Sequence, residues 1–394
     1  MTTPPTLPVP GARLRGVNLG GWLLLEKWIT PSLFADLAAT DETTWCAELG
    51  HEEATRRLHH HWQTFITRDD FAWLARTGIN AVRLPVGHWL FGPDYPYHRS
   101  YGENRHPFVV GGVAIVDQVF AWAGEFGLRV VLDLHAAPGC QNGFDNGGIL
   151  GVCEWHTDEA YIDHTLDVLE RLAERYRDHP ALHAIEALNE PRWDIPTDLL
   201  KRFTRAAYER IRRHCPAERV SVVFHDGFRS FREYAGFLQA PEFENVAIDI
   251  HRYQCFDRHD LDMDIFGHLR KTVTEWHTEV DEIVRDSGYQ VYCGEWSLGL
   301  NLQVVSLWAE GPFNHALEGM DAFQMATALR GYAAAQLLTF EKCDGWFFWT
   351  FRTETTPEWS LHDCVHMGVL PDLGRPEQVA GVERLLARSV GQAG

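Results

Sequence analysis

Short apolar runs rich in β-branched residues alternate with amphipathic segments along most of the chain. The predicted strands are Leu14–Leu19, Ala81–Pro85, Val130–Leu134, Ala184–Leu188, Val220–Phe224, Val246–Ile250, Gln290–Cys293 and Trp346–Trp349. Helical periodicity is clearest over Asp158–Arg177, Thr197–His214, Gly267–Asp286 and Ala322–Phe340. Eight strands separated by helical segments predict an α/β fold, a closed parallel (β/α)8 barrel.

The alternation continues without a Ser/Gly-rich linker or a change in composition, which predicts one domain. We place this domain at 13–394, after an N-terminal tail at 1–12. The alternative is a doubly wound open sheet, which normally has a Gly-rich phosphate-binding turn after its first strand. Here the first strand runs into Gly20–Gly21–Trp22, which lacks the third glycine and opens no clear helix. The sequence therefore favours a barrel with elaborated loops after its strands.

The composition is that of a globular protein, because 45% of the 394 residues are hydrophobic and 23% are charged. Asp and Glu outnumber Lys and Arg by 55 to 35, which gives a formal net charge of −20. Nucleic acid and anionic membranes are negatively charged and are therefore not expected as partners. The 15 Trp favour broad apolar platforms that line a cleft.

Neither a secretory signal nor a membrane span is evident in the sequence. The first residues show no basic stretch followed by an apolar run, and no segment reaches the roughly 18 apolar residues of a membrane span. The eight Cys are scattered singly, a pattern typical of reduced thiols. These features predict a cytoplasmic protein.

Polar side chains follow the predicted strands at the end where the active sites of such barrels lie. In chain order these residues are Arg83, His135, Asn189, Glu190, His251, Tyr253, Glu295 and Trp349. Taken alone, Glu190 could be a solvated loop carboxylate and Glu295 could pair with an arginine. In a barrel, however, the two carboxylates would face each other across its mouth. Glycoside hydrolysis requires such a pair, because one carboxyl group protonates the leaving oxygen while the other attacks the anomeric carbon.

A metal-dependent barrel hydrolase would need ligand spacing such as His-x-His at a strand end, and none occurs there. The run His59–His61 lies in a helical pattern, Glu52–Phe65, so its three rings point in different directions. We expect this run to form a solvated helix face. The sequence therefore predicts neither a metal nor a cofactor.

The ordered set of strand-end residues resembles the signature of glycoside hydrolase family 5, a group of retaining barrel glycosidases. A closer resemblance, to its exo-β-1,3-glucanase branch, is carried by RGVNLGGWLLLEKWITPSLF (15–34), HHWQTFITRDDF (60–71), HAAPGCQNGFDNGG (135–148), ALNEP (187–191), IDIHRYQCF (248–256), GEWS (294–297) and FFWTFRTETTPEWS (347–360). It extends from about residue 13 to 372. The resemblance implies a metal-independent exo-β-glycosidase with a carbohydrate substrate, of β-glucosidase or exo-β-1,3-glucanase type.

The resemblance also implies a role for each matching residue. Glu190 corresponds to the general acid/base and Glu295 to the nucleophile. Asn189 would hold the sugar 2-hydroxyl, while Arg83 and Tyr253 would bind Glu295 and favour its ionised form. Among the other implied substrate-binding residues, His135 and His251 would order the site. The pocket end would be closed by Glu26, Asp145 and Asn146. Trp349 would lie beneath the terminal sugar, and the leaving-side sugar would be flanked by Phe144 and Phe256.

Two departures from the family pattern leave the substrate open. Lys27 stands where the family usually has proline, and the segment Leu298–Asp321 is shorter than in the fungal enzymes. A family 5 β-mannosidase acting on short β-mannosides is therefore an alternative, as is a transglycosylase with the same site. A carbohydrate-binding pseudoenzyme is disfavoured because both carboxylates are present. The sequence fixes neither the glycone, the linkage nor the oligomeric state.

Overall fold

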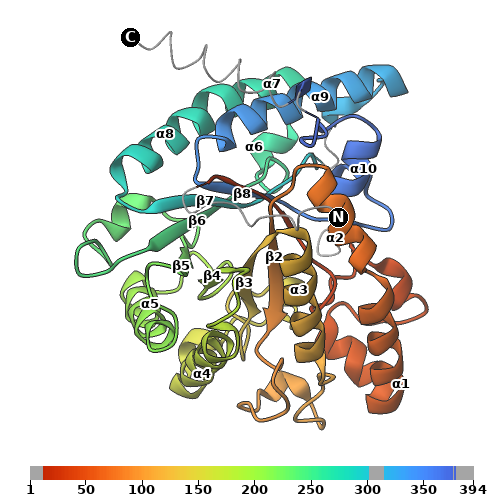
Figure 1. Cartoon of the computed structure of the whole chain (residues 1–394). Coiled ribbons are helices and arrows are strands. Elements are labelled where there is room, and N and C mark those ends of the chain that lie inside the picture. Colours follow the sequence, from red (N-terminus) through yellow and green to blue (C-terminus); the bar gives the residue numbers. More distant parts are fainter. Residues whose placement is uncertain (1–11, 301–314, 376, 379–394) are drawn as a thin grey trace, which may run out of the picture.

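Eight parallel strands form a closed barrel in the computed structural model, which describes residues 12–300, 315–375 and 377–378 (Figure 1). The strands are β1 (Leu14–Asn18), β2 (Ala81–Gly87), β3 (Arg129–Ala136), β4 (Leu182–Glu186), β5 (Ser221–His225), β6 (Val246–Arg252), β7 (Gln290–Trp296) and β8 (Gly345–Phe348). Neighbouring strands pair in chain order, and β8 closes the barrel by pairing with β1. The predicted (β/α)8 fold is confirmed.

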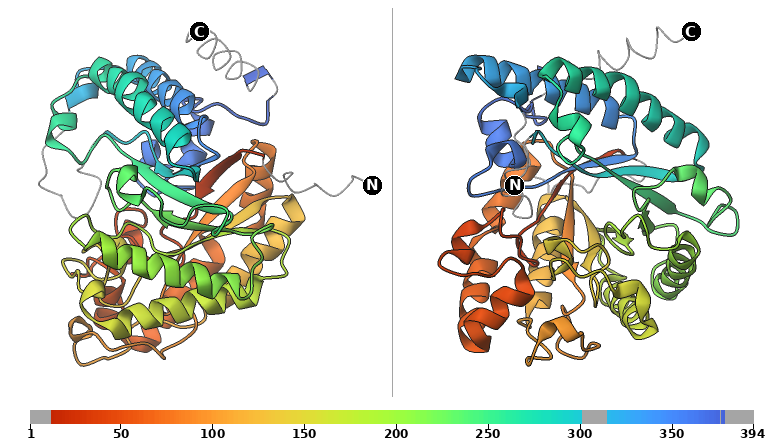
Figure 2. Two further views of the ribbon diagram at one scale, coloured as in Figure 1. Left: turned by 90° about the vertical axis from the view of Figure 1, so that its left-hand side faces the viewer. Right: turned by 180° about the vertical axis from the view of Figure 1, so that it is seen from behind.

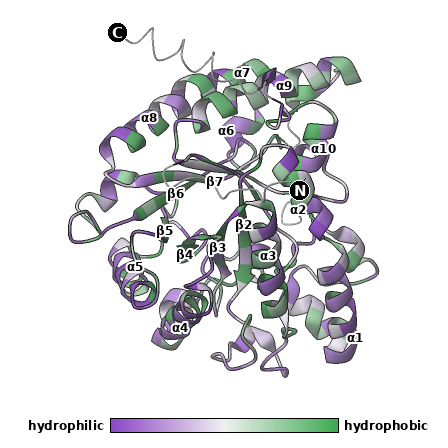
Figure 3. Ribbon diagram, in the orientation of Figure 1, coloured by the Kyte–Doolittle hydropathy of each residue, from purple (hydrophilic) through white to green (hydrophobic). Residues whose placement is uncertain are grey.

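Helices surround the strands, as Figure 2 shows from two further sides. The described α-helices are α1 (Glu42–Thr64), α2 (Arg68–Arg76), α3 (Gly112–Phe126), α4 (Glu159–Tyr176), α5 (Thr197–Arg212), α6 (Arg258–Leu261), α7 (Ile265–Lys271), α8 (His277–Asp286), α9 (Ala322–Phe340) and α10 (Leu361–His366). A π-helical turn, Thr272–Trp276, joins α7 to α8. The outer helices carry both hydrophilic and hydrophobic residues (Figure 3), as helices do when one face packs on a barrel.

The first long helix begins ten residues before the expected helical segment. α1 starts at Glu42, after Asp41, whose carboxylate caps the first turn. Within this helix His61 is buried, and its Nε2 lies 2.8 Å from the carbonyl oxygen of Gly21. The expectation that His59–His61 forms a solvated face is therefore wrong for His61, because the helix turns this ring toward the loop after β1.

The barrel interior is built in layers that determine what lies beneath the mouth. The layer nearest the strand starts is apolar and takes one side chain from each strand: Leu14, Ala81, Val131, Ala184, Val223, Ala247, Tyr292 and Phe347. Side chains two positions apart on a strand point to the same face. The next layer therefore holds Arg83, Asp133, Glu186, His225 and Asp249, all buried. A charged layer, rather than an apolar one, supports the mouth of the barrel.

The strand ends differ from the predicted ends where the candidate residues lie. The pairing of β6 with β7 continues through a shift of register and sets His251 opposite Glu295. Such irregularities redirect side chains next to active sites. β4, in contrast, ends at Glu186, so Asn189 and Glu190 lie in the loop that follows rather than at the strand end.

Parts of the predicted organisation lie outside the described residues. Of the expected tail, 1–12, only Ala12 is described, and 301–314 falls within the atypical segment after β7. Among the described residues, no helix combines the length and the apolar character that crossing a membrane requires. The eight Cys are all free thiols, as expected.

Candidate active site

Arg83, on β2, is fully buried, and each of its five N–H groups has an acceptor. Nη1 donates to Oδ1 of Asn18 at 2.9 Å and to Oε1 of Glu295 at 3.0 Å. Nε and Nη2 donate to the carboxylate of Glu186 at 2.7 and 3.1 Å, and Nη2 also donates to Oδ1 of Asn189 at 2.9 Å. The planar guanidinium thus holds Glu295 and Asn189 in fixed positions relative to each other.

Glu295, at the end of β7, accepts a second hydrogen bond, from the hydroxyl of Tyr253 at 2.8 Å. Both contacts expected from the sequence are present, and both favour the ionised carboxylate. Burial is nevertheless the larger effect, and together with the negative charge of Glu190 it raises the pKa of Glu295 to about 8.

Glu190 lies in the loop after β4 with a backbone φ of 42°, in the left-handed region that non-glycine residues rarely occupy. Its Oε1 lies 2.6 Å from Nδ1 of His251, and the same nitrogen lies 3.4 Å from Oε2 of Glu295. These two carboxylate oxygens are therefore no further apart than the sum of the two distances. Because one imidazole nitrogen reaches both groups, the two carboxylates lie close together, as the double displacement of a retaining glycosidase requires.

His251 is positively charged in this arrangement. Burial acts to lower the pKa of His251, but the charges of Glu295 and Asp249 outweigh it and hold this pKa well above the ordinary value. Nε2 of His251 lies 3.4 Å from Oδ2 of Asp249, whose Oδ1 accepts the backbone N–H of Gly294 at 2.6 Å. Burial also acts to raise the pKa of Glu190, but its hydrogen bond with His251 lowers this pKa overall.

His135, at the end of β3, differs from His251 in being neutral, because burial lowers its pKa well below the ordinary value. Its Nδ1 lies 2.5 Å from Oδ2 of Asp133, and its Nε2 lies 3.2 Å from Nδ2 of Asn189. A neutral ring that donates to Asp133 through Nδ1 accepts from Asn189 at Nε2. Since Arg83 holds the other end of the Asn189 amide, the orientation of this side chain is fully determined.

Trp349, directly after β8, is buried with its indole ring parallel to the imidazole of His135. The ring centroids are 5.4 Å apart and the planes differ by 10°. The peptide bond between Trp349 and Thr350 is cis. The ring therefore lies beside His135 at the mouth of the barrel, and its place beneath the terminal sugar stays a prediction.

Glu26, in the loop after β1, is buried and accepts a hydrogen bond from the indole N–H of Trp28 at 3.0 Å. Burial, with the charges of Asp145 and Glu295, raises the pKa of Glu26 well above its ordinary value. This shift favours the neutral carboxylic acid. The neighbouring Lys27 donates to a backbone carbonyl at 2.9 Å, so its ammonium group is already engaged with the protein's own backbone.

The other predicted binding residues come from the loops after β3 and β6. Asp145 is buried, and Asn146 accepts a hydrogen bond from the side chain of Asn142 at 3.0 Å. Phe144 is half-buried in the same loop. Phe256, by contrast, is 50% exposed and packs edge-on against Tyr253, with 5.5 Å between ring centroids. These loops follow the ends of β3 and β6, at the mouth of the barrel.

Five residues of the site were not identified from the sequence. They are Asn18, Asp133, Glu186, His225 and Asp249, all buried. A detectable signal existed, because each is a polar residue inside or directly after an apolar strand. The strand-end rule misses the acidic residues, which point into the barrel one layer below the mouth.

Two groups of side chains could offer ligand atoms to a metal ion. One consists of Glu190, His225 and His251, the other of Glu186, Asp249 and His251, and the atoms of each group lie within 4.8 Å of one another. Sequence spacing gave no hint of them, because the donors come from different strands. His251 also forms ion pairs with Glu190 and with Asp249. Metal independence therefore stays a prediction.

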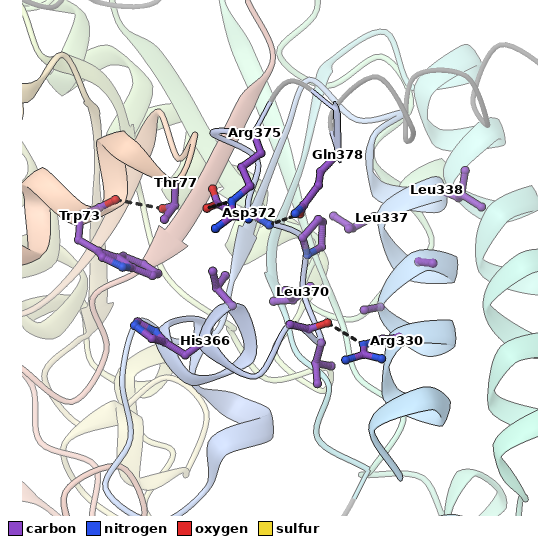
Figure 4. A pocket seen from close by; sticks show the side chains of 16 residues that line it. Trp73, Thr77, Arg330, Leu337, Leu338, His366, Leu370, Asp372, Arg375 and Gln378 are labelled. Atoms are coloured by element: carbon purple, nitrogen blue, oxygen red, sulfur yellow. Dashed lines mark hydrogen bonds and ion pairs between the residues drawn. The ribbon is translucent and has the colours of Figure 1, made fainter. Parts of the chain in front are cut away.

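A cavity of about 760 Å³ lies apart from this site, between α2, α9 and the segment after α10 (Figure 4). Trp73, Arg330 and Asp372 are among its lining residues, and none of the candidate site residues is. Because α2 ends shortly before β2 begins, this cavity lies toward the strand starts, at the end opposite the mouth.

A (β/α)8 barrel with two buried carboxylates beside one imidazole at its mouth carries the pair of groups that glycoside hydrolysis requires. Residues 46–330 of the chain match the cellulase domain of glycosyl hydrolase family 5. The chain belongs to this family and is a glycoside hydrolase, as the resemblance implied.

Relatives and solved structures support the family and the fold. The chain is 38% identical to the probable glucan 1,3-beta-glucosidase A of Aspergillus fumigatus and 36% identical to the glucan 1,3-beta-glucosidase of Blumeria graminis. In both cases the match covers 91% of this chain and 87% of the relative. The crystal structure of rutinosidase from Aspergillus niger has a TM-score of 0.73 at 19% identity, covering 91% of this chain and 98% of that one. That likeness shows the shared fold.

Proposed function

We propose that the chain is an exo-acting, retaining β-glucosidase that removes terminal β-D-glucosyl residues from short β-1,3-linked oligosaccharides or small glycosides. The observation that carries the proposal is the contact of one nitrogen, Nδ1 of His251, with both Glu190 and Glu295. The two relatives named glucan 1,3-beta-glucosidase, at 36% and 38% identity, support the glucosyl group and the linkage.

In the proposed reaction Glu190 is the general acid/base and Glu295 the nucleophile. Glu295 attacks the anomeric carbon and forms an ester with the sugar, while the glycosidic bond breaks and Glu190 gives its proton to the leaving oxygen. Water then attacks the ester as Glu190 takes up one of its protons, which frees the sugar and restores Glu295. Each of the two attacks inverts the configuration of the anomeric carbon, so the product keeps the β configuration.

The reaction requires different protonation states of the two carboxyl groups, a proton on Glu190 and none on Glu295. The hydrogen bonds that Arg83 and Tyr253 donate to Glu295 favour its ionised form. His251 contacts both carboxylates and so links the two groups whose proton the reaction uses.

The pocket end is proposed to enforce exo action. Glu26 and Asp145 come from separate loops, after β1 and β3, yet lie close enough for the charge of Asp145 to raise the pKa of Glu26. Hydrogen-bonding groups from two loops around one sugar would close the non-reducing end. Asn189, with its amide oxygen held by Arg83, would offer Nδ2 to the 2-hydroxyl of that sugar.

A panel of nitrophenyl β-D-glycosides, followed by laminaribiose, cellobiose and mannobiose, tests the proposal. We expect the glucoside and laminaribiose to give the highest kcat/KM, and proton NMR to show β-glucose as the first product. A preference for the mannoside and mannobiose would instead establish a β-mannosidase. An α-anomer would contradict the retaining mechanism, and products longer than the substrate would indicate transglycosylation.

A further inference from the structure

Glu190, the general acid/base of the proposed reaction, has an unusual backbone conformation. Its φ of 42° lies in the left-handed region, which is unfavourable for a residue other than glycine and persists only where the surrounding structure enforces it. Pro191 follows directly and has no backbone N–H that could fix the chain at that point. The contacts that hold Glu190 in this conformation are therefore expected on the residues that flank this pair.

Gln141, in the loop after β3, makes contacts on both sides of Glu190. Its side-chain Nε2 donates to the backbone carbonyl of Asn189 at 2.9 Å. Its own backbone carbonyl accepts the N–H of Arg192 at 3.1 Å. The peptide group before Glu190 and the residue after Pro191 are thus both attached to one residue of the neighbouring loop.

The side chain of Gln141 is completely buried and forms three hydrogen bonds, all with the backbone. Besides the bond to Asn189, Nε2 donates to the carbonyl of His135 at 2.7 Å, and Oε1 accepts the N–H of Ala137 at 3.1 Å. Two carbonyls need the amino group and one N–H needs the oxygen, so the amide can take only one orientation. The side chain of Gln141 is therefore a rigid link between the loops after β3 and β4.

We propose that Gln141 is a positioning residue for the general acid/base. By fixing the peptide group before Glu190, it holds the carboxyl group of Glu190 where His251 contacts it and where it can reach the glycosidic oxygen. Proton transfer to the leaving oxygen requires hydrogen-bonding distance, whereas the attack of Glu295 on the sugar requires no contact with Glu190. The inference rests on the proposed function for the role of Glu190. Its consequence is that the effect of Gln141 on activity depends on the leaving group.

A merely structural role of Gln141 would have a different effect. Loss of this side chain would then loosen both loops, and with them the side chains of His135 and Asn189. Binding of the terminal sugar would weaken to the same extent for every substrate that carries this sugar. Substrates with the same sugar and different leaving groups therefore distinguish the two roles.

The test compares a substrate that needs a proton on its leaving group with one that does not. We measure kcat/KM, which covers the steps up to ester formation, for laminaribiose and dinitrophenyl β-glucoside with wild type, Gln141→Met and Glu190→Gln. Gln141→Met keeps the length of the side chain and removes both N–H donors. It should lower kcat/KM for laminaribiose about ten- to hundredfold and that for dinitrophenyl β-glucoside no more than about threefold.

A second variant and a matched control complete the set. Gln141→Glu keeps the shape of the side chain and an acceptor for Ala137, but has at most one donor in place of two. It should show a loss in the same direction, and it carries the test if circular dichroism shows that Gln141→Met does not fold. Gln239→Met is the control: Gln239 also donates to a backbone carbonyl, that of Ser287 at 3.0 Å, but this carbonyl lies three residues before β7 starts, at the barrel end opposite the mouth. This variant should behave as wild type.

Equal losses on both substrates in the Gln141 variants, or no loss on laminaribiose, would overturn the proposal. The proposed function would stand in that case if Glu190→Gln still distinguishes the two substrates. If Glu190→Gln loses activity equally on both, the role of Glu190 in the proposed function is wrong, and the positioning role of Gln141 fails with it. If wild type cleaves mannobiose and not laminaribiose, mannobiose and dinitrophenyl β-mannoside decide the same question.

Discussion

Nδ1 of His251 lies 2.6 Å from Oε1 of Glu190, and both side chains are buried. The pKa of His251 is held well above its ordinary value by Glu295 and Asp249, whose charges outweigh burial. The general acid/base of this glycosidase therefore rests against a buried cation. Such a cation favours the ionised form of every carboxyl group around it.

Replacing this cation should shift the pH dependence of activity upward. In His251→Asn both carboxyl groups lose the positive charge, so the two apparent pKa values of the pair rise together. We expect both limbs of the kcat/KM profile with nitrophenyl β-glucoside to move to higher pH, with a lower maximum. His60→Asn, an exposed histidine on α1, is the control. Limbs that stay in place, or that move equally in both variants, would contradict this account.

The two carboxylates should respond differently to the leaving group. Glu295→Gln removes the nucleophile and should lower turnover by several orders of magnitude on every substrate. Glu190→Gln should still form the ester from dinitrophenyl glucoside, whose leaving group needs no proton, and should fail on laminaribiose. Azide should restore the second step in Glu190→Gln by replacing water. Equal losses across leaving groups in both variants would show that the roles are wrongly assigned.

The fold and the rim of the site were predictable because both depend on local patterns. Each strand is a short apolar run, and Arg83, His251 and Glu295 lie in or directly after such runs. The rule that active sites of this fold lie at the strand ends then placed these residues at the mouth of the barrel. The same rule placed Glu190 only approximately, because β4 ends four residues earlier, at Glu186.

The supporting layer could not be predicted in the same way. Asp133, Glu186 and Asp249 become partners of Arg83 or His251 only after the strands close into a barrel. The number of residues between them along the chain does not reveal how the strands align in the barrel. The pKa of Glu295 could not be predicted either, because it results from opposing effects: Arg83 favours ionisation, and complete burial opposes it more strongly.

Activity should not depend on a divalent metal, although five residues that could offer ligand atoms form two groups that share His251. His251 and the carboxylates satisfy one another as ion pairs, and the double-displacement reaction needs no Lewis acid. Dialysis against EDTA should leave kcat/KM unchanged, and Zn²⁺, Mn²⁺ or Mg²⁺ should not increase it. Activity that disappears on chelation and returns with one of these ions would show that a metal occupies the site.

Stability should fall with rising pH because of Glu42 at the start of α1. Burial raises the pKa of Glu42 from its ordinary value of 4.5 to about 8, against the hydrogen bond that it accepts from the backbone of Leu25 at 2.8 Å. A group that holds its proton more tightly when folded contributes full stability below about pH 4.5 and loses this contribution up to about pH 8. Glu42→Gln removes this pH dependence of stability. The Tm of the variant minus that of wild type should therefore be larger at pH 8.5 than at pH 5. The exposed Glu52→Gln should show no such trend.

Glu26 should be required for exo action as a neutral hydrogen-bonding group rather than as a charge. Burial and the charge of Asp145 raise its pKa well above the ordinary value, which favours the neutral carboxylic acid. Glu26→Ala should lower kcat/KM for nitrophenyl β-glucoside at least about tenfold, which corresponds to roughly 1.4 kcal/mol in the transition state. Glu26→Gln, of similar shape and also neutral, should retain considerably more activity.

A time course on a laminari-oligosaccharide completes the test: wild type should release glucose from the start and shorten the chain one unit at a time. Equal losses in the two variants would show that the charge is needed, and early internal fragments would show that Glu26 closes no pocket end.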